Sequence, residues 1–150
     1  MEFCVYHSPI GEISCLLDEG RLVELTLRGD LCDETPGKGT EGLKKELDLY
    51  FSGELTEFRQ EIRFLQGTPF ERAVWLSLRE IPCGETRSYR WIAERVGRPK
   101  AARAVGQALR KNPLPVILPC HRVICSNGGL GGYVSGLDHK KWLLKHEGAL

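Results

Sequence analysis

The chain has 150 residues, enough to bury a sizeable core but close to the usual size of one domain. Hydrophobic residues make up 41% and charged residues 27%, values typical of a globular protein that exclude a disordered or membrane-embedded one. No apolar run could cross a bilayer and the N-terminus lacks a secretory layout, so we expect a cytoplasmic protein with reduced thiols and no membrane partner.

The net charge of +1 conceals a division along the chain. Residues 1–66 hold 7 Lys and Arg against 14 Asp and Glu, whereas residues 67–150 hold 14 against 6. The first part is therefore acidic and the second basic. Because a basic surface attracts polyanions, we predict a nucleic-acid-binding domain over residues 67–150. For residues 1–66 we predict a structural α/β lobe.

The first lobe is predicted to be a small antiparallel sheet with one helix. Apolar and polar residues alternate in three stretches that turn residues separate, at 3–5, 13–17 and 22–27. After the polar segment 30–40, apolar residues recur at helical spacing from Leu43 until Gly53. No catalytic constellation is visible, which favours a platform role for this lobe.

The cysteines do not indicate a metal centre. Their spacing is irregular and no Cys-x-x-Cys pair occurs, at positions 4, 15, 32, 83, 120 and 125. A zinc site built from Cys4, His7 and Cys15 is an alternative that lacks the usual paired spacing. We predict no metal and no cofactor, and expect most of these thiols to be small buried side chains.

Capping signals predict three helices in the second lobe. The run Thr68-Pro69-Phe70-Glu71 is typical of a capping box with proline at the first helical position, and an apolar stripe follows to Ile81. Ser88 is a candidate cap for a helix from Tyr89 to Val96. A further helix is expected from Arg98-Pro99 to about Arg110. Two short helices joined by a tight turn indicate a helix-turn-helix.

This helix pair is basic. The stretch from Glu85 to Lys111 contains eight basic residues against two acidic ones, a bias that suits contact with phosphates. Small residues at 101, 102, 104, 106 and 108 would let the second helix approach a surface closely. That surface is either DNA or a neighbouring helix, and only the interleaved basic residues favour DNA.

A single cysteine has the surroundings of a nucleophile. The run 116–118 predicts a short buried strand, which leads into Pro119-Cys120-His121-Arg122-Val123. A thiol is nucleophilic only as thiolate, and His121 and Arg122 supply the imidazole and positive charge that favour this form. Adjacent side chains on a strand point apart, so a structural cysteine is the alternative.

The motif around Cys120 resembles the active-site motif of the O6-methylguanine-DNA methyltransferase family. Other segments follow in the family's order and spacing, namely Ser88-Tyr89, Pro99 to Gly106, Asn112-Pro113, Tyr133 and Trp142 to Gly148. The resemblance is strong from about Thr68 to Gly148 and loose in the first lobe. It implies an α+β fold, with a ribonuclease H-like lobe followed by a mainly helical lobe that carries the helix-turn-helix.

The resemblance implies direct-reversal DNA repair by a single-turnover, suicide enzyme, a methylated-DNA–protein-cysteine S-methyltransferase. Cys120 would irreversibly accept the methyl or alkyl group of O6-alkylguanine, and activity on O4-alkylthymine is left open. His121 would take the thiol proton through a water, and Glu147 would orient the imidazole. Tyr89 would donate a hydrogen bond to the departing guanine.

The resemblance also implies a DNA interface. The protein, expected to be a monomer, would bind double-stranded DNA through the minor groove and flip the damaged nucleotide out of the stack. Arg103 would enter the vacated stack, and the remaining contacts would come from Ala102, Tyr89, Arg110 and Lys100. The substrate pocket would be formed by Asn112, which ties a turn, by main-chain groups at Val123, and by Tyr133, Val134 and Ser135. Val134 departs from the serine of several family members, which leaves the substrate range open.

Two other functions fit part of the pattern. A helix-turn-helix regulator with a structural or redox-sensing cysteine shares every basic residue. A thiol hydrolase shares the Cys–His pair, but it would turn over many times through an acyl intermediate. Covalent transfer of label from O6-methylguanine in DNA, at most once per chain, separates the repair protein from both.

Overall fold

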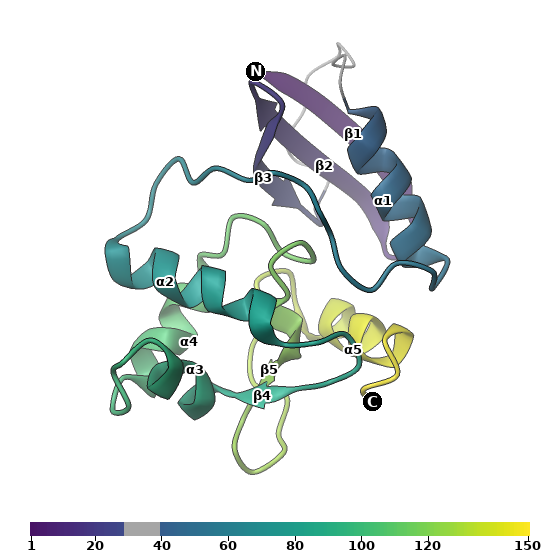
Figure 1. The fold of residues 1–150 in the computed structure, drawn as a ribbon. Helices are drawn as coiled ribbons and strands as arrows, with labels where there is room; N and C mark the ends of the chain where they lie inside the picture. The colour runs from purple at the N-terminus through teal and green to yellow at the C-terminus, as the bar shows by residue number, and fades with distance from the viewer. Residues whose placement is uncertain (29–39) are drawn as a thin grey trace. The chain divides into compact units, whose positions relative to one another are not determined.

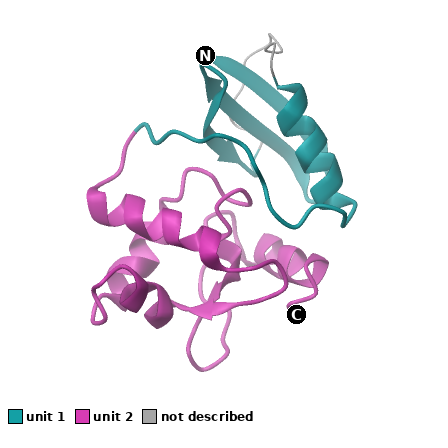
Figure 2. Ribbon diagram, viewed as in Figure 1, with its two compact units in different colours: residues 1–65 teal, residues 66–150 magenta. Residues whose placement is uncertain are grey.

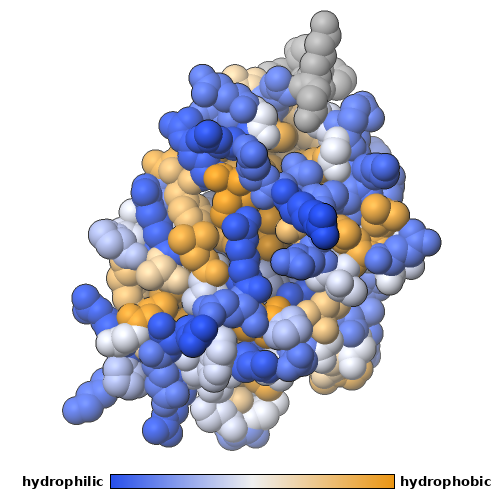
Figure 3. All heavy atoms as spheres, viewed as in Figure 1, coloured by the Kyte–Doolittle hydropathy of each residue, from blue (hydrophilic) through white to orange (hydrophobic). Residues whose placement is uncertain are grey.

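A computed structural model describes residues 1–28 and 40–150, and Figure 1 labels its helices and strands. The chain forms two compact units, residues 1–65 and 66–150, which Figure 2 colours separately. Most of the polar segment predicted at 30–40, with Cys32, lies outside the described residues. In the described part no helix is long and apolar enough to cross a membrane. Hydrophilic residues predominate on the face drawn in Figure 3, with apolar ones between them.

The first unit contains the predicted antiparallel sheet, with strand order β1-β2-β3. Its strands are β1 (Glu2–Ser8), β2 (Gly11–Asp18) and β3 (Arg21–Thr26). Glu19 and Gly20 join β2 to β3 with φ angles of 49° and 80°, the left-handed pair that suits a two-residue hairpin. Helix α1 (Glu41–Phe51) follows, and Tyr6 of β1 donates a hydrogen bond of 2.6 Å to Asp48 of α1. The predicted α+β class, a small antiparallel sheet with helices, is confirmed.

The structure does not assemble the alternative zinc ligands. Cys4 and Cys15 are register partners on β1 and β2 and are both buried, but His7 is exposed and pairs with Glu12. Residues three apart on a strand point to opposite faces, so His7 cannot join Cys4. Over residues 1–28 and 40–150, no group of three or more His, Cys, Asp or Glu residues could hold a metal ion.

The second unit contains four of the helices, and the predicted caps on two of them are confirmed. They are α2 (Pro69–Ser77), α3 (Tyr89–Arg95), α4 (Ala102–Arg110) and α5 (Leu137–His146), with a 3₁₀ turn η1 (Leu78–Glu80) after α2. The Thr68 hydroxyl accepts from the Glu71 amide (3.1 Å) and the Glu71 carboxylate accepts from the Thr68 amide (2.9 Å). Ser88 accepts from the Trp91 amide at 3.0 Å. Trp75 of α2 donates to the Ala108 carbonyl of α4 at 2.8 Å, which fixes these two helices together in the core.

Two sequence predictions are wrong, one about where a helix begins and one about the type of an element. The helix expected from Arg98-Pro99 begins only at Ala102, because residues 98–101 form a separate turn in which the Ala101 amide donates to the Arg98 carbonyl at 2.9 Å. The run 116–118 is buried as expected but is a turn rather than a strand. Neighbouring prolines at 113 and 115 cannot donate to a strand ladder, Val116 has a φ of +75°, and the Leu118 amide donates to the Leu114 carbonyl at 2.8 Å.

A short parallel strand pair connects the helix pair to the cysteine motif. Strand β4 (Arg87–Ser88), immediately before α3, pairs with β5 (Val123–Ile124), with Arg87 opposite Val123. The 3₁₀ turn η2 (Cys120–Arg122) immediately precedes β5. Residues far apart in the sequence, on α3 and in the cysteine motif, are thereby held in one site.

Candidate active site

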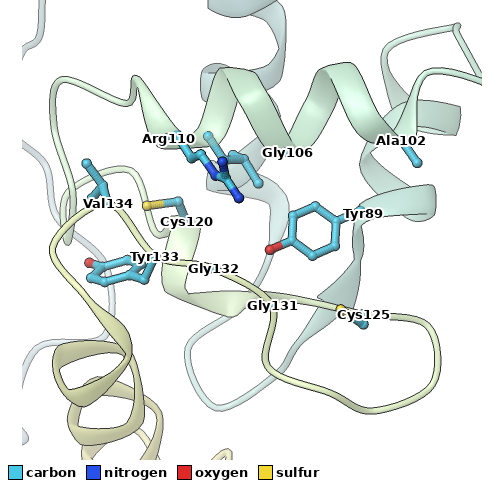
Figure 4. Close-up of a pocket in the computed structure, with 11 residues that line it drawn as sticks. Tyr89, Ala102, Gly106, Arg110, Cys120, Cys125, Gly131, Gly132, Tyr133 and Val134 are labelled. Carbon is cyan, nitrogen blue, oxygen red and sulfur yellow. The ribbon is translucent and has the colours of Figure 1, made fainter.

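A cavity of about 260 Å³ lies beside Cys120 in the second unit. Six of the predicted site residues line it, namely Tyr89, Ala102, Arg110, Cys120, Tyr133 and Val134. Figure 4 shows that they come from the start of α3, from α4, from η2 and from the loop before α5. The sequence did not single out Leu109 or Cys125, which also line the cavity. The arrangement is a pocket with a thiol at its edge and a phenol and a guanidinium around it.

The Cys120 thiol is neutral in the free protein at neutral pH. Only 4% of the residue is exposed, and this burial raises the pKa of Cys120 to about 11. Asn112, Lys140 and Tyr133 act in the opposite direction, by hydrogen bonding or positive charge, without outweighing burial. The sulfur therefore needs a base that removes its proton when it reacts.

Asn112 ties the turn that leads to Cys120. Its amide group donates to the Leu118 carbonyl at 2.9 Å, and its side-chain oxygen accepts from the Leu114 amide at 3.0 Å. Only 3% of Asn112 is exposed, so both bonds are shielded from water. They hold the left-handed Val116 in place and thus set where Cys120 emerges.

A buried carboxylate connects His121 to Arg122. The Glu147 Oε2 atom lies 2.8 Å from His121 Nε2 and accepts from Arg122 Nη2 at 2.9 Å, while Oε1 accepts from Arg122 Nε at 2.8 Å. The side chains of His121 and Glu147 are fully buried. Burial opposes the charge of Glu147, but hydrogen bonds from His121 and Arg122 hold its pKa well below the usual range. Because the carboxylate can only accept, Nε2 carries the proton of a neutral imidazole.

The other imidazole nitrogen is left available. His121 Nδ1 is buried and makes no hydrogen bond to any residue that the structure describes. Burial lowers the pKa of His121, and Glu147 only partly reverses this effect. His121 is thus a neutral base with an acceptor nitrogen, the form that proton removal requires.

Lys140 is a buried site residue that sequence reasoning missed. Its ammonium donates to the carbonyls of Val123 (2.7 Å), Leu130 and Gly132 (3.0 Å), and the residue has no exposed surface. Burial lowers the pKa of Lys140 to about 8. In the sequence it adjoins Lys141 and resembles a solvated charge. The available signal was its helical spacing with the apolar residues at 143 and 144.

The loop before α5 passes close to Tyr89. Gly131 has a φ of +72°, and a Cβ added there would lie 2.9 Å from Tyr89 Cε2. Tyr89 is half-buried, and burial raises its pKa. Three predicted pocket residues are not among those that line the cavity: Asn112, Val123 and Ser135. The Val123 carbonyl accepts from Lys140 at 2.7 Å, and the Ser135 hydroxyl lies 2.9 Å from His139 Nδ1.

Ion pairs divide the basic residues between 85 and 111 into two groups. Four are paired with carboxylates: Arg87 with Glu85, Arg90 with Glu94, Arg95 with Glu80, and Lys111 with Glu71. Arg98 lies over the Phe70 ring, 5.7 Å from its centroid. Lys100, Arg103 and Arg110 are exposed and form no ion pair with a described residue. These last three, all predicted DNA contacts, have charges available to an external anion.

Comparison with known proteins gives consistent matches. Residues 69–149 match the family model described as 6-O-methylguanine DNA methyltransferase, DNA binding domain. The methylated-DNA–protein-cysteine methyltransferase of Methanosarcina acetivorans is 44% identical over an alignment of 156 positions, which covers 99% of each chain. The crystal structure of Mycobacterium tuberculosis OGT in complex with DNA aligns with a TM-score of 0.91 at 41% identity, over 99% of this chain and 94% of that one. An O6-methylguanine DNA methyltransferase from Methanococcus jannaschii aligns with a TM-score of 0.69 at 28% identity, over 98% and 94% of the two chains.

Proposed function

Since this chain belongs to the 6-O-methylguanine DNA methyltransferase family, we propose that the sulfur of Cys120 is the acceptor of the alkyl group. The protein is a methylated-DNA–protein-cysteine methyltransferase: it repairs DNA by transferring an alkyl group from a base to one of its own cysteines. The observation that carries the assignment is the placement of Cys120 at the pocket, next in sequence to the His121–Glu147 pair. Cys125 also lines the pocket but has no such neighbour in the sequence.

The reaction transfers one alkyl group and consumes the thiol. The Cys120 sulfur attacks the alkyl carbon of O6-alkylguanine, the new S–C bond forms as the C–O bond breaks, and the electron pair stays with the guanine. His121 Nδ1 accepts the thiol proton through one water molecule, with Glu147 orienting the imidazole. Tyr89 donates a hydrogen bond to the departing guanine, which takes up one proton overall. A thioether does not revert, so each chain reacts once.

DNA is the partner, and we propose that it binds across α3 and α4. These two helices and their turn would act as a helix-turn-helix docked in the minor groove, whose degenerate base pattern suits a protein indifferent to sequence. Arg103 would replace the flipped nucleotide in the stack, while Lys100 and Arg110 would contact phosphates. All three are exposed and form no ion pair with a described residue.

The two units would have different tasks. Residues 67–150 would form the DNA-binding and alkyl-acceptor domain, and residues 1–66 a ribonuclease H-like platform. We expect the protein to work as a monomer in the cytoplasm, without metal or cofactor. Val134 would give the pocket an apolar side chain where several family members have serine, and Val123 main-chain groups would receive the guanine amine. Transfer from duplexes that carry longer O6-alkyl groups or O4-alkylthymine would show the substrate range of this pocket.

The test is covalent transfer of a label. Duplex DNA with O6-methylguanine, radiolabelled on the methyl group, is mixed with reduced wild-type protein, Cys120→Ala and the matched pocket variant Cys125→Ala. We expect one label per wild-type chain, located at Cys120 by mass spectrometry, full transfer in Cys125→Ala, and DNA binding without transfer in Cys120→Ala. Label on the Cys120→Ala chain would move the acceptor elsewhere. No transfer to the reduced wild type would support the regulator, and repeated turnover would support the hydrolase.

A further inference from the structure

A pair of cysteines faces helix α1 in the first unit. Cys4 of β1 and Cys15 of β2 are register partners in the antiparallel sheet, so their side chains lie on the same face. Tyr6, two residues after Cys4 on β1, shares that face and donates its hydrogen bond to Asp48 of α1, which Figure 1 shows alongside the sheet. The two thiols therefore lie between sheet and helix, and both are free and buried.

The separation of these register partners suits a disulfide. Opposite residues of an antiparallel pair have Cα atoms about 4.5 or 5.5 Å apart, depending on whether the pair is hydrogen-bonded. Both separations fall within the range of about 4.4–6.8 Å that disulfides require. The thiols of Cys4 and Cys15 already share a hydrogen bond, so their sulfur atoms are neighbours. A bond between them thus requires no shift of the strands.

The surroundings of Cys4 stabilise a thiolate. The Cys15 thiol donates a hydrogen bond to it, Lys44 of α1 adds positive charge, and the Thr40 hydroxyl donates a second hydrogen bond. Thr40 is the N-cap residue of α1, but its side chain makes no capping hydrogen bond. Burial and Glu41 act in the opposite direction, yet the pKa of Cys4 is lowered to about 7. The pKa of Cys15 is raised by its hydrogen bond to Cys4 and by burial, so one thiol ionises while its partner keeps a proton.

We propose that Cys4 and Cys15 form an oxidation site that reacts with small hydroperoxides and closes to a disulfide. The Cys4 thiolate attacks one peroxide oxygen, the O–O bond breaks, and the alkoxide or hydroxide that leaves takes a proton from solvent. The Cys15 sulfur then attacks the Cys4 sulfenic acid, and the S–S bond forms as the thiol proton and the hydroxyl group leave as water. Two electrons pass from the two thiols to one peroxide. The inference goes beyond the proposed function, because neither cysteine lines the alkyl-acceptor pocket.

A purely structural role for the pair predicts a different order of oxidation. Only 3% of Cys4 is exposed, so accessibility alone would make the partly exposed Cys83 and Cys125 react first. Hydroperoxides attack thiolates rather than thiols, and burial raises the pKa of Cys83. A thiol with a pKa near 7 is about half ionised at pH 7, against about 3% of a thiol with the usual pKa of about 8.5. We therefore expect Cys4 to be oxidised about tenfold faster than Cys83.

The experiment follows each cysteine separately. Reduced protein is treated with equimolar hydrogen peroxide at pH 7, and samples taken over time are quenched with dimedone and iodoacetamide for peptide mass spectrometry. We expect the Cys4–Cys15 disulfide as the first product in the wild type. In Cys15→Ala, which lacks the second thiol, a dimedone adduct should accumulate on Cys4. In Cys4→Ala, Cys15 should stay reduced, and the matched control Cys83→Ala should form the disulfide at the wild-type rate.

Two results would overturn the proposal. One is oxidation of Cys83 or Cys125 before Cys4, and the other is a disulfide that joins Cys4 to a cysteine other than Cys15. Should a variant not fold, the wild-type time course alone decides between these results and the expected one. The time course contains no alkylated DNA, so failure of label transfer would refute the proposed function without changing the conclusion about the cysteine pair.

Discussion

Replacement of Gly131 by alanine should damage the pocket more than the fold. Alanine at a φ of +72° costs about 1–2 kcal/mol because its Cβ crowds the backbone. That Cβ would also collide with the Tyr89 hydroxyl oxygen and lie 2.9 Å from Cε2 of the same ring, closer than real Cβ atoms approach. To restore contact at ordinary distance, the Tyr89 ring must move by about 1 Å, a misplacement that can cost about 100-fold in rate.

Gly128 supplies the matched control in the same loop. Its φ is +88°, but a Cβ there would meet nothing within 4 Å. Urea unfolding should therefore show similar losses of about 1–2 kcal/mol for Gly128→Ala and Gly131→Ala. Single-turnover transfer from O6-methylguanine in duplex DNA should be near normal in the first and about 100-fold slower in the second. Equal transfer rates in the two variants would refute the contribution of Tyr89 to the reaction.

Three further outcomes are expected. Arg103→Ala should slow repair of duplex DNA about tenfold while its reaction with the free base is unchanged. Arg90→Ala, which removes a cation already paired with Glu94, is the control in the same assay. Equal losses of Arg103→Ala on both substrates would contradict base flipping by Arg103. Glu147→Gln should lower the free energy of unfolding at pH 7 by about 3–5 kcal/mol. Because the folded pKa of Glu147 lies below the unfolded value of 4.5, the difference in free energy of unfolding between wild type and Glu147→Gln should shrink as the pH falls below 4.5. Denaturant titrations at several pH values measure this difference, and a difference that does not change with pH would contradict a role of the carboxylate charge. Lys140→Met should cost about 3 kcal/mol in the same unfolding assay, since three buried carbonyls lose their donor; a neutral effect would mean that water replaces the ammonium.

Local signals predicted much of the second unit. The capping box at Thr68 and the cap at Ser88 depend only on residues within one helical turn, and both are present. The motif at Cys120 and the resemblance around it pointed to six residues that line one cavity. These predictions are correct for a common reason. Each depends on residues close together in the sequence or on a motif whose spacing is fixed.

The failures depend on contacts that local composition does not reveal. The buried run at 116–118 has the composition of a strand, but its conformation is decided by Asn112 and by the flanking prolines. Lys140 has the composition of a surface residue, and only the folded loop at 130–132 supplies the carbonyls that make its burial tolerable. The sharing of Glu147 between His121 and Arg122 joins residues about 25 positions apart, which spacing alone does not reveal.

Helix α5 has a strict length requirement. Lys140 and Glu147 are seven residues apart, close to two full turns, so one face of the helix and its C-cap serves the loop carbonyls and the imidazole together. Inserting one residue between them would rotate Glu147 by about 100° away from His121. Substitutions on the opposite side are tolerated far more easily: Lys141 and Lys145 are exposed. A fluorophore attached at either lysine would leave the site intact. Its fluorescence anisotropy would rise when the protein binds damaged duplex, and would thus report the fraction of bound chains.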